Sequence, residues 1–155
     1  FFTSFLLVKY WLNNKKIILY KDPKNTYINK FVFFGIGSAV LLVIHSIFLG
    51  IKFEYELYKL FRRVVILFFI VFEIIAQTYL VICLYKIRYS ISENINEIFL
   101  KLKIFLVSLL IIVALISIPI ISVPGNKYLK HALEWDYFVG VISFYLLTFF
   151  MWKKN

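Results

Sequence analysis

The sequence alternates long apolar blocks with short polar segments rich in Lys. Four blocks have the roughly 20 residues that a helix needs to cross a bilayer. The complete spans are predicted at residues 31–51, 64–85, 104–123 and 134–152, and the end of a fifth at residues 1–12. In lipid, backbone polar groups must be bonded within the segment, which favours helices. The pattern predicts an all-α fold: a polytopic transmembrane helix bundle, with four complete spans plus the end of a fifth in a single domain over residues 1–155.

The polar segments set the expected orientation. Residues 13–30 are predicted to form a loop with a turn at Pro23. Residues 86–103 are predicted to form a helix at the membrane surface, because Ser90 and Glu93 have the spacing of a capping box. When the loop 13–30 is placed in the cytosol, the cytosolic segments hold eleven Lys or Arg and the opposite side six. This bias follows the positive-inside rule and predicts a cytosolic C-terminus.

Composition and charge agree with a membrane protein. Of 155 residues, 63% are hydrophobic, and the mean hydropathy is +0.88, which is above the usage of soluble domains. The net charge of +10 comes mostly from Lys and Arg beside the apolar blocks, where they contact anionic lipid headgroups. We therefore expect membrane lipids, and not nucleic acid, as partners. Fifteen Lys against three Arg, with abundant Ile, Phe, Tyr and Asn, is typical of an AT-rich genome.

One cysteine limits the chemistry that the chain can perform. Cys83 is the only cysteine and lies inside an apolar block, which excludes an internal disulfide and a cysteine-based metal cluster. We interpret it as a small core residue. Since the short loops contain no recognisable catalytic motif, we predict a protein that is not an enzyme and that has no cofactor and no bound metal.

Small residues recur along one side of the first complete span. These partner-packing candidates are Gly35, Ala39, Ser46 and Gly50. In lipid, a stripe of small residues lets another helix approach closely. His45 lies beside this stripe, and a lone His in that place is more often hydrogen-bonded inside the bundle than a ligand.

The second complete span carries an ionisable residue. Glu73 and Gln77 are one helical turn apart and share a face. Because a carboxyl group in mid-membrane costs several kcal/mol unless it is paired, wetted or protonated, it should face the bundle or a partner. A hydrogen-bonded structural lock is the favoured interpretation. An ion- or proton-coupled site that includes His45 is the alternative, although transporters usually show internal repeats and broken helices.

Polar residues also open the last span. His131 and Glu134 are three residues apart and could share a helical face with Asp136 nearby, as paired acid and base groups for acyl transfer or hydrolysis. The simpler interpretation is an interface signature. In it, Glu134 lies in the first turn of a helix, where a carboxylate offsets the positive end of the dipole, and Trp135 anchors at headgroup level.

Short motifs in three spans resemble the Frag–DRAM–Sfk family of six-span eukaryotic membrane proteins. Glu134–Trp135 and the aromatic run 144–150 resemble the last span of that family. Residues 77–80, leading to Tyr85–Lys86, resemble its Gln-centred fourth span, and Lys9–Tyr10 resembles the end of its second span. The resemblance implies a divergent member whose first one and a half helices precede this chain.

The chain departs from the family pattern in two places. No His-x-x-Gly-Ala-like element precedes the Gln-centred span, and Glu73 stands where an aromatic residue is expected. The resemblance implies a plasma-membrane or endolysosomal location and a role in autophagy, phosphoinositide organisation or remodelling of lipid-anchored proteins. It transfers no catalytic residue.

Two functions from different classes follow from these observations. The favoured one is an accessory or regulatory subunit that binds a larger membrane protein, such as a cation pump or transporter, through helix packing. The alternative is a membrane-lipid regulator or lipid-remodelling protein of the Frag–DRAM–Sfk type.

Overall fold

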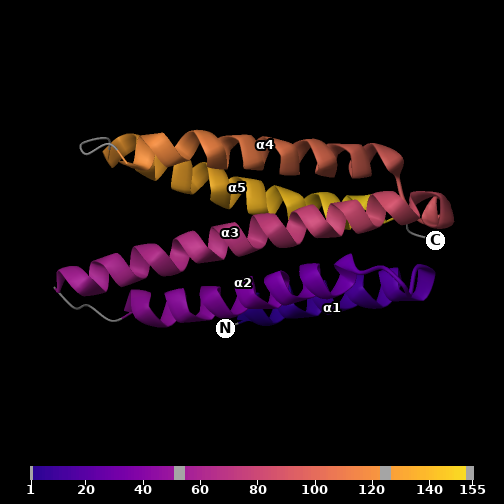
Figure 1. The fold of residues 1–155 in the computed structure, drawn as a ribbon, viewed down its shortest axis with the longest axis horizontal. Helices are drawn as coiled ribbons and strands as arrows, with labels where there is room; N and C mark the ends of the chain where they lie inside the picture. The colour runs from indigo at the N-terminus through magenta and orange to yellow at the C-terminus, as the bar shows by residue number, and fades with distance from the viewer. Residues whose placement is uncertain (1, 51–54, 123–126, 153–155) are drawn as a thin grey trace. The chain divides into compact units, whose positions relative to one another are not determined.

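The protein is described by a computed structural model that covers residues 2–50, 55–122 and 127–152. These residues form five α-helices and one short 3₁₀ helix, without named strands (Figure 1). The elements are α1 (Phe2–Lys21), α2 (Tyr27–Gly50), α3 (Glu56–Ile87), the 3₁₀ helix η1 (Arg88–Ile91), α4 (Glu97–Ser122) and α5 (Lys127–Met151). The all-α prediction is confirmed.

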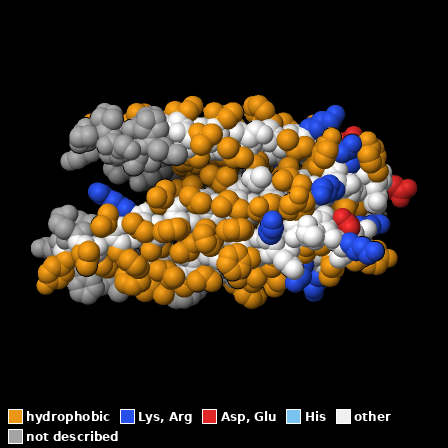
Figure 2. All heavy atoms as spheres, in the orientation of Figure 1, with side chains coloured by type: hydrophobic (Ala, Val, Ile, Leu, Met, Phe, Trp, Pro, Cys, Tyr) orange, Lys and Arg blue, Asp and Glu red, His pale blue; other side chains and the backbone are white. Residues whose placement is uncertain are grey.

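Among the described residues, three helices have the length and apolarity of a membrane span. The qualifying stretches are Tyr27–Phe48 in α2, Leu60–Ile91 at α3 and Glu97–Ser117 in α4, and α5 contains a shorter apolar stretch, Trp135–Met151. On the face shown in Figure 2, hydrophobic side chains cover most of the helix sides. In water such a surface would drive aggregation. These features indicate an integral membrane protein.

The chain consists of two compact units, residues 1–83 and 84–155, and α3 runs from the first into the second. Each unit has its own buried side chains and is described by itself. The prediction of one helical domain over residues 1–155 stays a prediction.

In the first unit, α1 continues through residues that were predicted to be a loop. It ends at Lys21 and not at Leu12. The reason is the spacing of Trp11, Asn14 and Ile18, which puts three buried side chains on one side of the helix. The connection to α2 is therefore short. In it, the amide of Tyr27 donates to Asn25 Oδ1 at 3.0 Å, which satisfies one open N–H of the new helix.

Aromatic rings join α2 to α3. Phe34 meets Phe72 edge to face, with ring centroids 5.2 Å apart, and Tyr27 stacks on Tyr79 at 5.7 Å. The Nζ atom of Lys30 lies 5.5 Å from the ring centroid of Tyr79, so a cation covers the stacked pair. These contacts lie along the first half of α2.

The second unit is a hairpin of α4 and α5. A Cβ atom at Gly140 would lie 2.5 Å from the side chain of Leu110, so the missing side chain lets the helices approach closely. The rings of Phe99 and Phe150 stack with centroids 5.8 Å apart. The amide of Asn96 donates to Met151 O at 2.8 Å, which ties the end of α5 to the residue before α4.

The predicted surface helix over residues 86–103 is formed only from residue 97 onward. α3 ends at Ile87, η1 follows, and α4 begins only at Glu97. The helix start is capped by Asn96, whose Oδ1 accepts from the amide of Ile98 at 3.0 Å. Asn is a strong N-cap residue next to a long apolar block, and this cap replaces the one expected from Ser90 and Glu93.

Candidate functional site

A fully buried polar cluster links α2 to α3 in the first unit. It consists of Ser38, Glu73 and Gln77, none of which is exposed to solvent. Ser38 Oγ lies 2.7 Å from Glu73 Oε2, and Gln77 Nε2 donates to Glu73 Oε1 at 3.0 Å. The predicted shared face of Glu73 and Gln77 is present. Sequence reasoning missed Ser38, because it lies 35 residues away on another helix.

The position of Ser38 defines two possible hydrogen-bond arrangements. Its Oγ also lies 2.8 Å from Gly35 O, and a hydroxyl group has one hydrogen for two neighbouring oxygens. When Ser38 donates to Glu73, the carboxylate accepts both bonds of the cluster. When Ser38 donates to Gly35 O, the carboxyl group must carry the hydrogen that joins it to Ser38. In both cases the cluster fastens α2 to α3, as a structural lock does.

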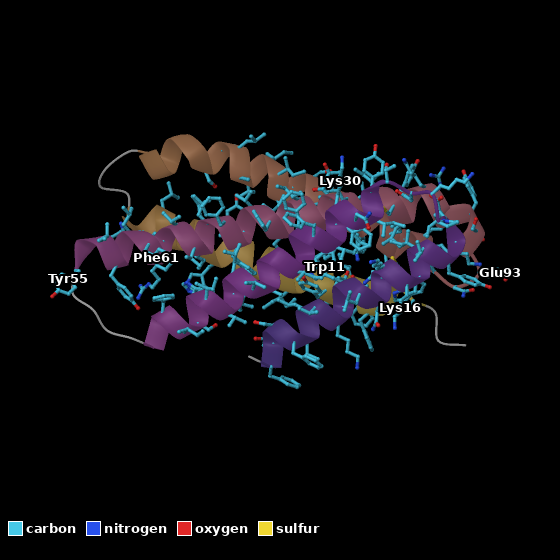
Figure 3. The ribbon with its side chains drawn as sticks, turned by 60° about the horizontal axis from the view of Figure 1, so that its bottom comes forward. Trp11, Lys16, Lys30, Tyr55, Phe61 and Glu93 are labelled. Carbon is cyan, nitrogen blue, oxygen red and sulfur yellow. The ribbon has the colours of Figure 1, made fainter. Side chains whose placement is uncertain are left out.

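The small-residue stripe of α2 is divided between covered and exposed parts. Gly35 and Ala39 are buried, and a Cβ atom at Gly35 would lie 2.4 Å from the ring of Trp11. Trp11 of α1, labelled in Figure 3, therefore fills the gap that Gly35 leaves. Ser46 is exposed, with its hydroxyl donating to Leu42 O at 2.8 Å. Gly50 ends α2.

His45 and Cys83 occupy different surroundings. His45 is half-buried on α2, seven residues beyond Ser38. Cys83 is buried on α3, with its Sγ 3.8 Å from Asn25 Oδ1. The interpretation of Cys83 as a core residue agrees with this burial.

The predicted interface signature, His131, Glu134 and Trp135, does not lie at the start of the helix as expected. α5 begins at Lys127, so Glu134 lies beyond its first turn and does not offset the positive end of the dipole there. The side chains of His131 and Glu134 lie outside the described part of the structure. Trp135 is 67% exposed and meets Phe138 edge to face at 5.9 Å. Its anchoring role stays a prediction.

A buried lysine in the second unit was not anticipated. Lys103 is fully buried on α4, its Nζ donates to Thr148 Oγ1 on α5, and it lies 3.9 Å from the ring centroid of Phe144. Lys103 was predicted to lie in the surface helix over residues 86–103, among the basic residues of the cytosolic side. The signal that could have found it is its spacing with Val107 and Leu110, three buried residues on one helical face.

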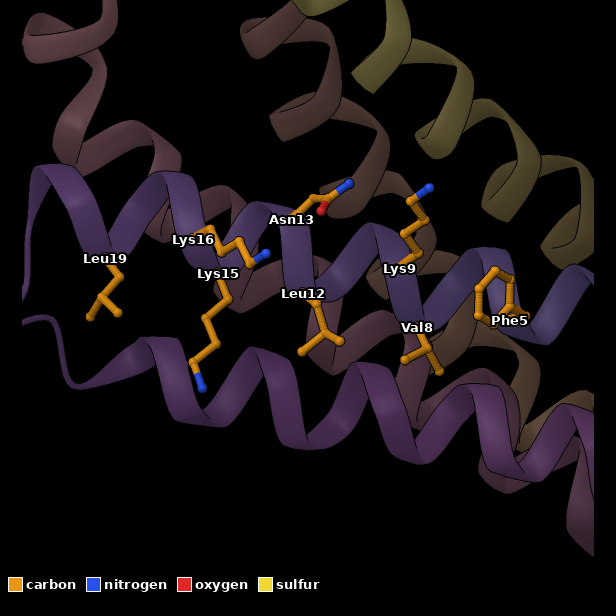
Figure 4. A pocket seen from close by; sticks show the side chains of 8 residues that line it. All are labelled: Phe5, Val8, Lys9, Leu12, Asn13, Lys15, Lys16 and Leu19. Carbon is orange, nitrogen blue, oxygen red and sulfur yellow. The ribbon is translucent and has the colours of Figure 1, made fainter.

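An open groove follows the outer side of α1 (Figure 4). Its volume is about 550 Å³. Its walls combine apolar side chains with lysines, and the lining residues are Phe5, Val8, Lys9, Leu12, Asn13, Lys15, Lys16 and Leu19. This side of the helix lies opposite the buried Trp11, Asn14 and Ile18.

The described residues contain no group of three or more His, Cys, Asp or Glu side chains that could hold a metal ion. Comparison of the chain with known protein families, curated proteins and solved structures finds no match. The candidate sites are therefore defined by their own geometry: the Ser38–Glu73–Gln77 cluster, the Lys103 contact, the stripe on α2 and the outer side of α1.

Proposed function

We propose that this chain is a non-enzymatic integral membrane protein that acts as an accessory or regulatory subunit. It binds a larger membrane protein, such as a cation pump or transporter, by helix packing. The membrane is the plasma membrane or an endolysosomal membrane, with the C-terminus of the chain in the cytosol.

The exposed part of the small-residue stripe carries this proposal. At Gly35, α2 admits the Trp11 ring of α1 at close range. Ser46 lies eleven residues further along the same side, about 16 Å along the axis, and is exposed. Its hydroxyl is already bonded to Leu42 O, so a helix can pack over it without leaving that donor open.

Another side of α2 differs in character and supplies a control. Phe33, Val40 and Ile47 are spaced by seven residues, so they share one side, and they are 66%, 51% and 44% exposed. Large, exposed apolar side chains suit contact with acyl chains. The proposal therefore separates a close-packing side at Ser46 from a lipid-facing side at Val40.

Substitution of a bulky residue on each side tests the proposal. The protein is purified under mild detergent from native membranes, and stoichiometric partner proteins are quantified. Ser46→Phe is expected to lose the partner, whereas Val40→Phe retains it at equal expression. A protein that migrates alone, or a partner that tolerates Ser46→Phe, would contradict the assignment of the surface.

A membrane-lipid regulator of the Frag–DRAM–Sfk type is the second candidate. The observation in its favour is the lysine-containing groove on α1. A change of membrane lipid composition on deletion of the protein, restored by the wild-type chain, is its direct test. If the membrane lipid composition is unchanged after deletion, the lipid-regulator function is excluded and the accessory function is the remaining proposal.

A further inference from the structure

The first helix has two chemically different sides. One side carries four buried residues, Ser4, Trp11, Asn14 and Ile18, and packs inside the first unit. The opposite side forms the groove, where Phe5, Lys9 and Lys16 are exposed. Contacts within the first unit therefore account for the burial of the first side of α1. They do not cover the second side, which forms the groove.

The groove side separates into a polar line and an apolar line. Lys9, Asn13 and Lys16 are spaced by four and three residues, so their side chains follow one another turn by turn. Val8 and Leu12 run alongside. In Figure 4, Lys9 and Asn13 point to one side of α1, and Val8 and Leu12 to the other. All three polar residues are exposed.

The charge of α1 is not balanced within the helix. It contains four lysines and no Asp or Glu. Among the described residues, the ammonium groups of Lys9 and Lys16 make no ion pair within 4.0 Å. Two ammonium groups and an amide in line can donate to the oxygens of one phosphate. The complementary ligand is therefore an anion.

The apolar line restricts the kind of anion. Phe5, Val8 and Leu12 lie beside Lys9 in the N-terminal part of the groove, and Lys15 and Lys16 follow about one turn after Leu12. A free phosphate would use the lysines alone. An apolar helix of another protein would leave buried ammonium groups without partners, which is costly in lipid. An amphiphile fits both lines, because its phosphate can bind the polar line and its acyl chains can pack against the apolar line.

We propose that the outer side of α1 binds one anionic phospholipid. Lys9, Asn13 and Lys16 hold its phosphate, and its acyl chains lie against Phe5, Val8 and Leu12. The site is independent of the accessory-subunit proposal, because it uses α1 and not Ser46. It gives the lipid-regulator candidate a defined binding site, and lipid binding would persist in a protein that regulates no lipid.

Native mass spectrometry of the full chain tests the site. The protein is reconstituted in phosphatidylcholine nanodiscs containing phosphatidylserine, and the bound lipids are counted after release. The double variant Lys9→Gln, Lys16→Gln is compared with the double variant Lys21→Gln, Lys24→Gln. Both remove two positive charges from exposed positions of the same unit, and only the first changes the groove.

The wild-type chain and the Lys21, Lys24 control are expected to retain one phosphatidylserine. The Lys9, Lys16 variant is expected to bind it about tenfold more weakly or worse. Asn13→Asp is expected to weaken binding similarly by repulsion, with the net charge lowered by one only. Circular dichroism and gel filtration test whether each variant is folded. If the Lys9→Gln, Lys16→Gln variant is not folded, the single variant Lys16→Gln takes its place.

Three results of the lipid-binding measurements would overturn the proposal. The first is equal loss in both double variants, which would show only a general attraction between charges. The second is retention of phosphatidylcholine as strongly as phosphatidylserine. The third is full competition by inorganic phosphate, which would show a headgroup-only anion site. Photocrosslinking at Leu12 to a protein instead of to lipid would also contradict the assigned ligand.

Discussion

Gly35→Ala tests the contact that joins α1 to α2. The added Cβ atom would lie 2.4–2.6 Å from three ring atoms of Trp11, where ordinary contacts begin at 3.4 Å. Trp11 is fully buried, and its ring meets Tyr10 at 5.0 Å and Phe31 at 6.2 Å between centroids. The ring therefore has little room to turn, and the helices must separate by about 1 Å, which is typical of overpacking that costs about 1–3 kcal/mol.

Helix propensity works in the opposite direction. Replacement of Gly by Ala inside a helix gains up to about 1 kcal/mol. The steric cost is the larger of the two effects, so we expect Gly35→Ala to lower the free energy of unfolding by about 1–2 kcal/mol. Unfolding in increasing SDS, followed by circular dichroism, measures this difference. Ser46→Ala is the control on the same helix, with an expected change within about 0.5 kcal/mol.

A double-mutant cycle decides whether Trp11 is the cause. Trp11→Leu removes the ring atoms that the new Cβ would meet. This substitution itself lowers the free energy of unfolding, because it leaves a cavity. In that background, Gly35→Ala should be neutral or stabilising, which gives a coupling energy of about 1 kcal/mol or more. Additive effects, or a Gly35→Ala protein as stable as the wild type, would refute the packing argument.

Three further predictions concern buried or capping polar groups. Glu73→Gln keeps the shape of the side chain and should cost under about 1 kcal/mol, whereas Glu73→Leu leaves the amide of Gln77 without its acceptor and should cost about 1–3 kcal/mol; equal SDS-unfolding curves for the two variants would contradict this. Lys103→Met removes a buried ammonium group and should leave the Tm unchanged or raise it; a Tm lowered by several degrees would show that the Thr148 contact is net stabilising. Asn96→Ala should speed amide hydrogen exchange at the start of α4 and cost about 0.5–2 kcal/mol, while Asn96→Asp retains most of the cap; equal exchange in both would exclude capping.

The sequence was sufficient for the class of fold and for contacts within one helix. Apolar blocks of membrane length predicted helices because lipid leaves the backbone few alternatives. Glu73 and Gln77 were predicted to share a face because one helical turn separates them. The extension of α1 to Lys21 was missed, since Lys15 and Lys16 were interpreted as a loop while Trp11 and Ile18 marked a buried side.

Contacts between helices could not be derived in the same way. The stripe at Gly35 predicts close approach by some helix, but its pattern does not say which, and Trp11 belongs to α1 of the same chain. Ser38 and Glu73 are 35 residues apart, and Lys103 and Thr148 are 45 apart. Such pairs depend on the rotation of each helix, which hydrophobicity alone leaves undetermined when apolar residues surround the whole helix.

The three tryptophans differ in burial enough to serve as optical reporters of separate parts of the protein. Trp11 is fully buried in the first unit, whereas Trp135 in the second is 67% exposed and Trp152 is partly exposed. In bilayers with brominated acyl chains, fluorescence from Trp135 should be quenched while that from Trp11 is spared. Loss of the α1–α2 contact would make Trp11 sensitive to the same lipid. Single-tryptophan forms of the chain would thus follow opening of the first unit without an attached dye.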